Sequence, residues 1–295
     1  MPSWTIALPP GAKNIRIKTA TQEIQVDWQF YRHGKDGAEV IVPLFGGDEF
    51  VGEVLEGNWK KGDDGSIQGP FTAKINNGYL ELTGRSDSAG TWRHGWINTE
   101  SKIPLLDDVV VDVHMKYSGL ATNSNIDFHC YLTAQETGLN SSVKDGLNLV
   151  LRAGTSSYYI FVAKRINGTQ TELVVMTAVS SSEGTFRIKF EEHKSGHNHT
   201  HIYFHEGSGE VDESNDELPG SPFSLDLAYD ALYVAFELDT SDDVNNTVSS
   251  DFVRVTYPDF KIKYDLDDDA YQGEGEELLK CAWDTSENGN HGTVY

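Results

Sequence analysis

The sequence predicts an all-β fold, an antiparallel two-sheet sandwich of the jelly-roll type with a small β-rich segment at its N-terminal end. Three observations support this prediction. Short segments in which apolar and polar residues alternate follow one another through most of the 295-residue chain. The stretches between them are rich in Gly, Ser and Asn, which favour turns. Convincing amphipathic helices are absent from the sequence, which excludes a doubly wound α/β fold.

The β-rich N-terminal segment occupies residues 1–46. Residues 14–18 and 23–28 alternate cleanly between apolar and polar side chains, and a third run covers residues 39–44. Three strands can stand as a subdomain, or they can extend the sheet that follows.

The main domain continues with a hairpin and a long series of strands. Asn77-Gly78 stands directly before the alternating residues 79–82, and Asn-Gly in that position is a strong hairpin signal. The further alternating segments are 109–117, 126–132, 147–152, 158–165, 172–179, 186–191, 200–205, 231–238 and 252–257.

Charge and composition restrict the classes of partner. The formal net charge of −23 is the opposite of a nucleic-acid footprint, and an acidic membrane surface would repel it. No run approaches the roughly 20 apolar residues that span a bilayer. We therefore expect no nucleic-acid partner and no membrane insertion. Cys130 is predicted to be a buried apolar thiol. Triplets of the glycosylation type begin at Asn140, Asn167, Asn198 and Asn245, and they favour an extracellular location only weakly.

Four motifs stand in order along the chain. They are Gly47-Asp48-Glu49-Phe50-Val51-Gly52 followed by Trp59, Ile75-Asn76-Asn77-Gly78-Tyr79-Leu80-Glu81-Leu82, Gly95-Trp96-Ile97-Asn98-Thr99 and Asp251-Phe252-Val253-Arg254-Val255. Together they resemble the concanavalin A-like lectin/glucanase superfamily of jelly rolls. The resemblance spans residues 47–258 and implies a concanavalin A-like sandwich there. The motifs are signatures of a fold and not of an activity.

The segment 259–295 differs in composition from the main domain. Its acidic stretches at 265–269 and 274–277 are typical of a linker. Residues 283–294 are similar to the start of a laminin-G-like jelly roll. We therefore expect an acidic linker followed by the start of such a module, with other modules of a longer chain as partners.

Catalysis of glycoside hydrolysis would need a specific carboxylate pattern. The resemblance implies Glu-x-Asp-x-(x)-Glu on one strand, because that spacing places a nucleophile and a general acid on one face. The nearest string that we find, Glu210-Val211-Asp212, lacks the final Glu and lies among Gly and Ser residues. We interpret it as a loop without the rigid support that a catalytic pair requires. We therefore assign no catalytic residue.

Polysaccharide lyases with this fold imply a second hypothesis, because they use His and Tyr beside Arg or amide groups. The polar faces of two predicted strands offer His114, His129 and Tyr131, and Arg152 stands nearby. This hypothesis requires these side chains to converge in one groove. The alternative is an ordinary solvated sheet face.

Carbohydrate binding requires only an aromatic platform and a few polar groups. Trp92, His94 and Trp96 share one face if their strand is regular; alternatively, Trp96 packs in the core and only Trp92 is exposed. The ligand-binding candidates are Trp92, His94, Trp96, His114, His129, Tyr131 and Arg152.

A structural calcium ion is a further expectation. The resemblance implies a site near the first and last strands of the jelly roll, which corresponds here to Asp48 and Asp251. Oxygen-only ligation fits Ca²⁺. The alternative is that both are hydrogen-bonded turn aspartates.

These observations favour a non-catalytic, lectin-like carbohydrate-binding module of a cell-surface, secreted or virion protein, with a polysaccharide or glycan as its partner. Two alternatives stay open. One is a polysaccharide lyase or glycoside hydrolase acting on the concave sheet face, and the other is a structural virion or adhesin protein without glycan binding.

Overall fold

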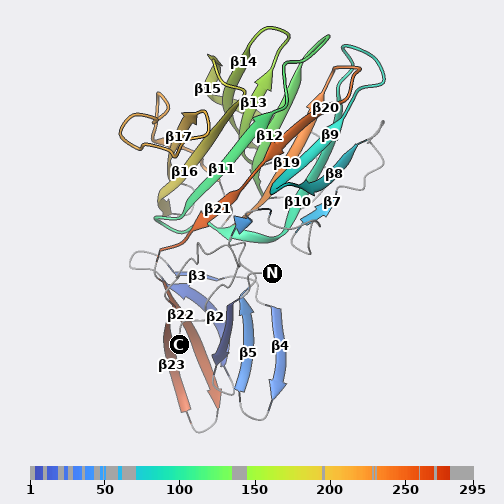
Figure 1. Cartoon of the computed structure of the whole chain (residues 1–295). Helices are drawn as coiled ribbons and strands as arrows, with labels where there is room; N and C mark the ends of the chain where they lie inside the picture. Colours follow the sequence, from blue (N-terminus) through green and yellow to red (C-terminus); the bar gives the residue numbers. More distant parts are fainter. Residues whose placement is uncertain are drawn as a thin grey trace.

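The computed structural model of the 295-residue chain describes the side chains of residues 48, 50, 59–60, 71–134, 145–191, 199–227, 229 and 231–258, and elsewhere the backbone of the strands named below. Every regular element in the described residues is a strand. No helix in this part of the chain is long and apolar enough to cross a membrane. The strands build two large antiparallel sheets, which confirms the predicted all-β sandwich (Figure 1).

One large sheet has seven strands. In spatial order they are β15 (Thr169–Val179), β14 (Tyr158–Ile166), β13 (Gly146–Ala153), β12 (Ile126–Thr133), β19 (Ala231–Thr240), β10 (Arg93–Pro104) and β7 (Trp59–Lys61). Strand β19 therefore lies inside the sheet, between β12 and β10.

The other large sheet has nine strands. Its main path runs through β18 (Phe223–Ser224), β17 (His197–Glu206), β16 (Glu183–Lys194), β11 (Val110–Tyr117), β20 (Asn246–Ser250), β9 (Tyr79–Gly84) and β8 (Thr72–Asn76), with β21 (Val253–Thr256) paired to β11 and β6 (Gly47–Asp48) paired to β21. Asn77 and Gly78 take positive φ angles of 52° and 80° between β8 and β9, so the predicted hairpin is confirmed.

The hydrophobic core lies between the two large sheets and follows from the alternation of the strands. Val113 and Met115 of β11 are fully buried, as are Phe128 and Cys130 of β12. Full burial of one such side chain contributes about 1.5–3 kcal/mol. Burial also raises the pKa of the Cys130 thiol, which is the buried apolar thiol that the sequence predicted.

The same alternation places the polar half of each strand on an outer face. Because β11 and β12 belong to different sheets, His114 lies on the outer face of the nine-stranded sheet, whereas His129 and Tyr131 lie on the outer face of the seven-stranded sheet. The expectation that His114 shares a groove with His129 and Tyr131 is therefore wrong. The sequence shows which half of each strand is polar, but not which sheet a strand joins.

Two smaller sheets are built from strands between residues 4 and 42 and between residues 260 and 279. They are β1 (Trp4–Leu8), β5 (Gly37–Val42) and β4 (Gln29–Gly34) in one, and β23 (Tyr271–Leu279), β22 (Phe260–Asp268), β2 (Ala12–Lys18) and β3 (Glu23–Gln25) in the other. Pairing of β22 with β2 joins the segment interpreted as an acidic linker to the N-terminal segment (Figure 1). Its acidic composition concealed the alternation of residues 260–266. The laminin-G-like start at 283–294 lies outside the described residues.

Candidate functional site

The outer face of the seven-stranded sheet carries a row of charged side chains across four neighbouring strands. His94 of β10 is the cross-strand partner of Asp239 of β19, Asp239 is the partner of Asp127 of β12, and Asp127 is the partner of Arg152 of β13. Cross-strand partners on one face have neighbouring Cβ atoms, so these four side chains meet. The next row contains Trp96, Glu237 and His129.

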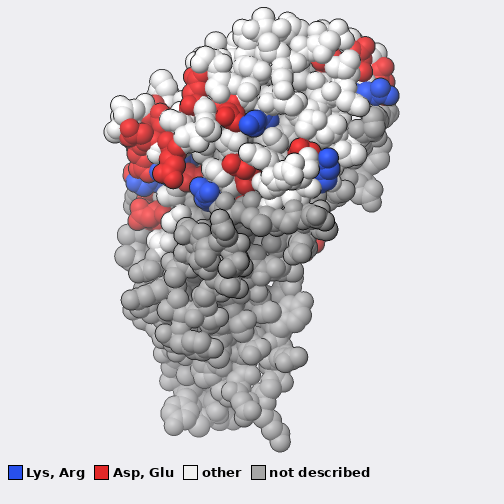
Figure 2. Space-filling model, viewed as in Figure 1, with Lys and Arg blue, Asp and Glu red and all other residues white. Residues whose placement is uncertain are grey.

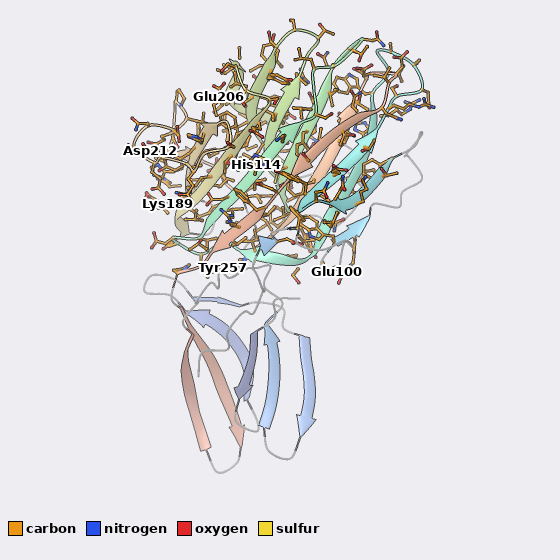
Figure 3. The ribbon with its side chains drawn as sticks, in the orientation of Figure 1. Glu100, His114, Lys189, Glu206, Asp212 and Tyr257 are labelled. Atoms are coloured by element: carbon orange, nitrogen blue, oxygen red, sulfur yellow. The ribbon has the colours of Figure 1, made fainter. Side chains whose placement is uncertain are left out.

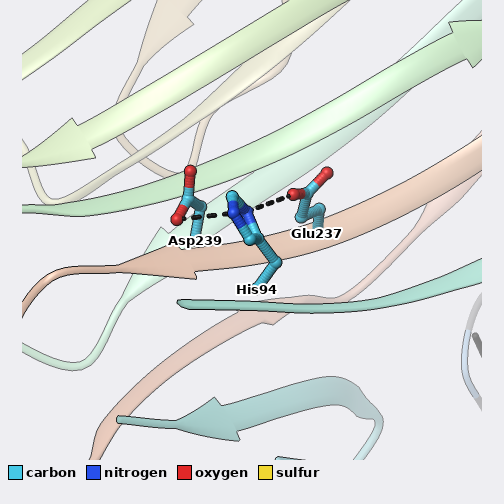
Figure 4. Close-up of side chains that lie close together, drawn as sticks. All are labelled: His94, Glu237 and Asp239. Carbon is cyan, nitrogen blue, oxygen red and sulfur yellow. Dashed lines mark hydrogen bonds and ion pairs between the residues drawn. The ribbon is translucent and has the colours of Figure 1, made fainter. Parts of the chain in front are cut away.

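His94 lies between two carboxylates (Figure 4). Its Nδ1 atom is 2.9 Å from Oε1 of Glu237 and 3.3 Å from Oδ1 of Asp239. Contacts with Asp239 and then Glu237 raise the pKa of His94 to about 10, although burial opposes this shift. The imidazole is therefore a cation at neutral pH. It compensates the charge of Glu237, which is only 1% exposed.

Arg152 compensates the charge of Asp127 in the same row. Its Nε and Nη2 atoms donate to the two oxygens of Asp127, each at 2.5 Å, in the bidentate geometry that gives strong charge-assisted hydrogen bonds. The guanidinium also lies 5.8 Å from the ring centre of Trp92 and 5.7 Å from that of Phe161. Arg152 therefore connects the buried carboxylate to two aromatic rings, of which Trp92 is 36% exposed.

His129 occupies the centre of the second row. Its Nδ1 atom lies 3.1 Å from Oδ1 of Asn148, and its ring stacks on Tyr131 at 5.2 Å with an interplanar angle of 5°. The other ring nitrogen, Nε2, is buried without a hydrogen-bond partner, and its nearest described carboxylate oxygen is Oδ2 of Asp127 at 3.9 Å. His129 is thus fixed in orientation with one nitrogen unused.

The three side chains of the predicted platform differ in accessibility. Trp92, His94 and Trp96 contribute to one face, and their role in binding stays a prediction. Trp92 is exposed and His94 half-buried, whereas Trp96 is only 1% exposed and packs with Tyr131 and Ala235 in a small cluster of its own. Trp96 therefore supports the face from within and does not form an open platform.

A pocket lies beside these rows on the same sheet. It is small, with a volume of about 10 Å³, and its lining includes Tyr131, Asn148, Arg165 and Gly146. Gly146 has a φ of 145°, and a Cβ atom there would lie 2.0 Å from the backbone oxygen of Leu132. Only glycine fits this close approach of two strands.

His114 has its own environment on the opposite side of the sandwich (Figure 3). Its Nδ1 atom lies 2.7 Å from Oδ1 of Asp251, its Nε2 atom lies 3.9 Å from Oε2 of Glu183, and its ring packs against Phe252. The imidazole is 4% exposed and is held by these neighbours. It has no part in the rows around His129.

The two predicted calcium ligands have protein partners. Oδ1 of Asp48 accepts the backbone N–H of Phe50, and Oδ2 accepts Nε1–H of Trp59, both at 2.8 Å. These bonds explain the spacing of the Asp-x-Phe…Trp motif and favour a hydrogen-bonded turn for Asp48. Neither Asp48 nor Asp251 belongs to the metal-capable groups among the described residues. Calcium at these residues stays a prediction.

Two groups in the described residues have the composition of a metal site. One consists of His94, Glu237 and Asp239, and the other of Asp127, His129 and Asp239. In each group the candidate ligand atoms lie within 4.8 Å of one another. Asp239 is common to both, which makes it the centre of the charged row.

Sequence analysis missed Glu237 and Asp239. The predicted strand ends at residue 238, whereas β19 continues to Thr240 and includes Asp239; its Phe236 and Leu238 are buried in the core. The signal was two carboxylates at alternate positions of an otherwise apolar strand, which places both on the outer face. The position three residues beyond Asp239 is Asp242, whose Oδ2 instead accepts the backbone N–H of Thr122 at 2.5 Å. The strand therefore carries two of the three carboxylates of the Glu-x-Asp-x-(x)-Glu pattern.

The segment Glu210-Val211-Asp212 lies in a loop, as the sequence predicted. Asp212 bonds to Ser214 and Asn215 of its own turn, and Glu213 pairs with Arg187 at 3.0 Å. Figure 2 shows Asp and Glu side chains gathered at the left of the sandwich, where Figure 3 labels Asp212. These carboxylates lie far in the fold from the seven-stranded face, on the side of β16 and β17.

Comparisons with known proteins concern the fold. No protein-family model matches the chain, and no curated protein matches it. Among solved structures, it is similar to a beta-1,3-glucanase from Mycobacterium marinum (15% identity, TM-score 0.46, 73% of this chain and 99% of that one) and to a legume lectin-like domain from Entamoeba histolytica (10% identity, TM-score 0.44, 70% and 96%). It is also similar to the carbohydrate recognition domain of Emp47p (10% identity, TM-score 0.44, 71% and 94%).

Proposed function

We propose that the outer face of the seven-stranded sheet binds a carbohydrate. One observation carries this proposal: the exposed ring of Trp92 adjoins a continuous row of polar groups formed by Arg152, Asp127, Asp239 and His94. A sugar offers an apolar C–H face that packs on an aromatic ring and hydroxyl groups that bond to charged side chains. The bonds within the row hold these groups in place before a ligand arrives, which lowers the entropic cost of binding.

The setting that we propose is a cell-surface, secreted or virion protein. Two of the four glycosylation-type triplets lie among the described side chains, and their Asn167 and Asn245 are exposed. Exposure is what an acceptor in a secreted protein needs. Glycan attachment at either residue in protein from the native source would support this setting.

A retention assay on polysaccharide gels, after a glycan-array screen, tests the proposal. Trp92→Ala is expected to weaken retention about 5-fold or more, because an aromatic platform contributes about 1 kcal/mol or more beyond its buried area. Tyr79→Ala is the matched control, since Lys116 lies 5.8 Å from the Tyr79 ring on the other sheet, as Arg152 does from Trp92. Equal loss in both variants would contradict the proposal. Retention by no glycan would favour a structural protein.

Glycoside hydrolysis on the same face is a second candidate. Glu237 and Asp239 offer oxygens within 4.8 Å of the same imidazole nitrogen and of each other, and retaining glycosidases hold their two carboxyl groups about 5–5.5 Å apart. Burial raises the pKa of Asp239, as a general acid requires. Release of reducing ends from a polysaccharide, lost in both Glu237→Gln and Asp239→Asn, would establish hydrolysis. The lyase alternative loses His114 from its cluster and has no comparable support.

A further inference from the structure

The group formed by Asp127, His129 and Asp239 has an unused ligand atom. His129 is 7% exposed, and its Nε2 atom has no hydrogen-bond partner. A buried ring nitrogen without a partner costs free energy, so its position calls for an explanation. Oδ1 of Asp239 is likewise buried without a well-directed hydrogen bond.

The surroundings of His129 prepare Nε2 to act as a ligand. When Nδ1–H donates to Oδ1 of Asn148, the neutral ring carries its lone pair on Nε2. Metal-binding histidines in proteins have this arrangement, in which the second nitrogen donates to an oxygen and fixes both tautomer and orientation. Stacking on Tyr131 further restrains the ring.

The two carboxylates are supported in the same way. Arg152 donates to both oxygens of Asp127, and His94 lies 3.3 Å from Asp239. Both contacts orient the carboxyl groups while further oxygen lone pairs stay available. Counting Glu237, three carboxyl groups lie here beside two cationic side chains, Arg152 and His94, so carboxyl groups are in excess and favour a further cation.

We propose that Nε2 of His129 and one oxygen each of Asp239 and Asp127 bind a divalent transition-metal ion of the zinc type. The three ligand atoms lie within 4.8 Å of one another. A tetrahedral ion with bonds of about 2.0–2.2 Å separates its ligand atoms by roughly 3.4 Å, a distance that small side-chain rotations reach. An imidazole ligand selects zinc, cobalt or nickel over calcium, which prefers oxygen alone.

Metal uptake by the full-length protein tests this inference without any carbohydrate. After removal of metals with a chelator, Co²⁺ is added and its visible absorption recorded, and Zn²⁺ is then used to displace it. We expect one Co²⁺ per chain with a spectrum of low coordination number, displacement by Zn²⁺, and no displacement by Ca²⁺. A wild-type protein that binds neither Co²⁺ nor Zn²⁺ would overturn the inference.

Four variants define the site and its control. His129→Gln is expected to weaken Co²⁺ affinity at least 100-fold, and Asn148→Ala roughly 10–100-fold, because Asn148 only orients the ligand. His114→Gln, a change of another buried histidine on the opposite sheet, is the control and should bind as the wild type does. If the His129→Gln variant does not fold, the Asp239→Asn variant is measured in its place. Unchanged affinity in a folded His129→Gln or Asp239→Asn variant would also overturn the inference. Because the readout is the ion, the inference stands or falls separately from glycan binding.

Discussion

Asp239 and Asp127 are cross-strand partners at the centre of the seven-stranded sheet. Each of the two carboxyl groups has a cationic neighbour on the side that faces away from the other. His94 lies beside Asp239, and Arg152 binds Asp127. Two adjacent carboxylates would otherwise repel each other in a poorly solvated place. This relationship keeps four charged groups ordered on one outer face, and it underlies both functions that we propose for that face.

The pair formed by Arg152 and Asp127 is expected to stabilise the fold strongly. Arg152→Gln leaves a carboxylate that is only 5% exposed without its partner. We expect a loss of about 3 kcal/mol in the free energy of unfolding, measured with urea, because removing one member of a buried pair strands the other charge. Lys74→Met is the control, since its pair with Glu81 is largely exposed, and it should cost less than about 1 kcal/mol. Similar losses in both variants would contradict this account.

Asp48 is expected to stabilise the main domain without calcium. Asp48→Ala removes two hydrogen bonds, to the backbone N–H of Phe50 and to the indole of Trp59. We expect a loss of about 2 kcal/mol in unfolding free energy that is the same in calcium and in a chelator. A loss seen only in calcium would instead support the predicted calcium site at Asp48 and Asp251.

Gly146 is expected to tolerate no side chain. Gly146→Ala introduces a Cβ atom 2.0 Å from the oxygen of Leu132 at a φ of 145°. We expect a loss of at least about 2 kcal/mol in unfolding free energy, because the two strands must move apart. Gly119→Ala has nothing within 4 Å of its Cβ and serves as the control. Thermal unfolding of both variants measures the difference, and equal midpoints would contradict the close approach.

Glu206 is expected to contribute stability at neutral pH that is lost in acid. It accepts the backbone N–H groups of Ser180 and Ser181 and the hydroxyl of Ser180, and these bonds lower the pKa of Glu206 below 4.5. A lowered pKa in the folded state adds stability above the unfolded value, and this stability is lost as the pH falls through the folded value.

Glu206→Gln tests this expectation when unfolding is measured between neutral pH and pH 3. The wild type should be more stable than the variant at neutral pH, and the difference should shrink below about pH 4.5. Glu100→Gln, at an exposed position, should follow the wild type throughout. A difference between wild type and Glu206→Gln that does not change with pH would contradict the assignment.

The sequence predicts the fold far better than the site, for physical reasons. Alternation along a strand shows which residues face the core, so Cys130 and the polar faces around His114 and His129 were all recognised. Alternation does not show which sheet a strand joins. The chain crosses between the sheets after residue 117, and that crossing separates His114 from His129.

The charged row was hidden for a related reason. Glu237 and Asp239 lie about 100 residues or more from Asp127 and His94 along the chain, and only the strand order β12–β19–β10 brings them together. Burial of Trp96 was one of two possibilities that the sequence left open, because it depends on Tyr131 of another strand. Local sequence patterns thus predict which side chains of a strand point outward. Long-range strand pairing decides which of these side chains meet on one face of a sheet.

A crystal structure of the protein with an oligosaccharide selected on a glycan array tests the central claim most directly. We expect a sugar ring packed on Trp92, with hydroxyl groups bonded to Arg152 or Asp239. A sugar bound instead on the nine-stranded sheet near His114, with the Trp92 ring uncovered, would contradict the assignment of the functional face.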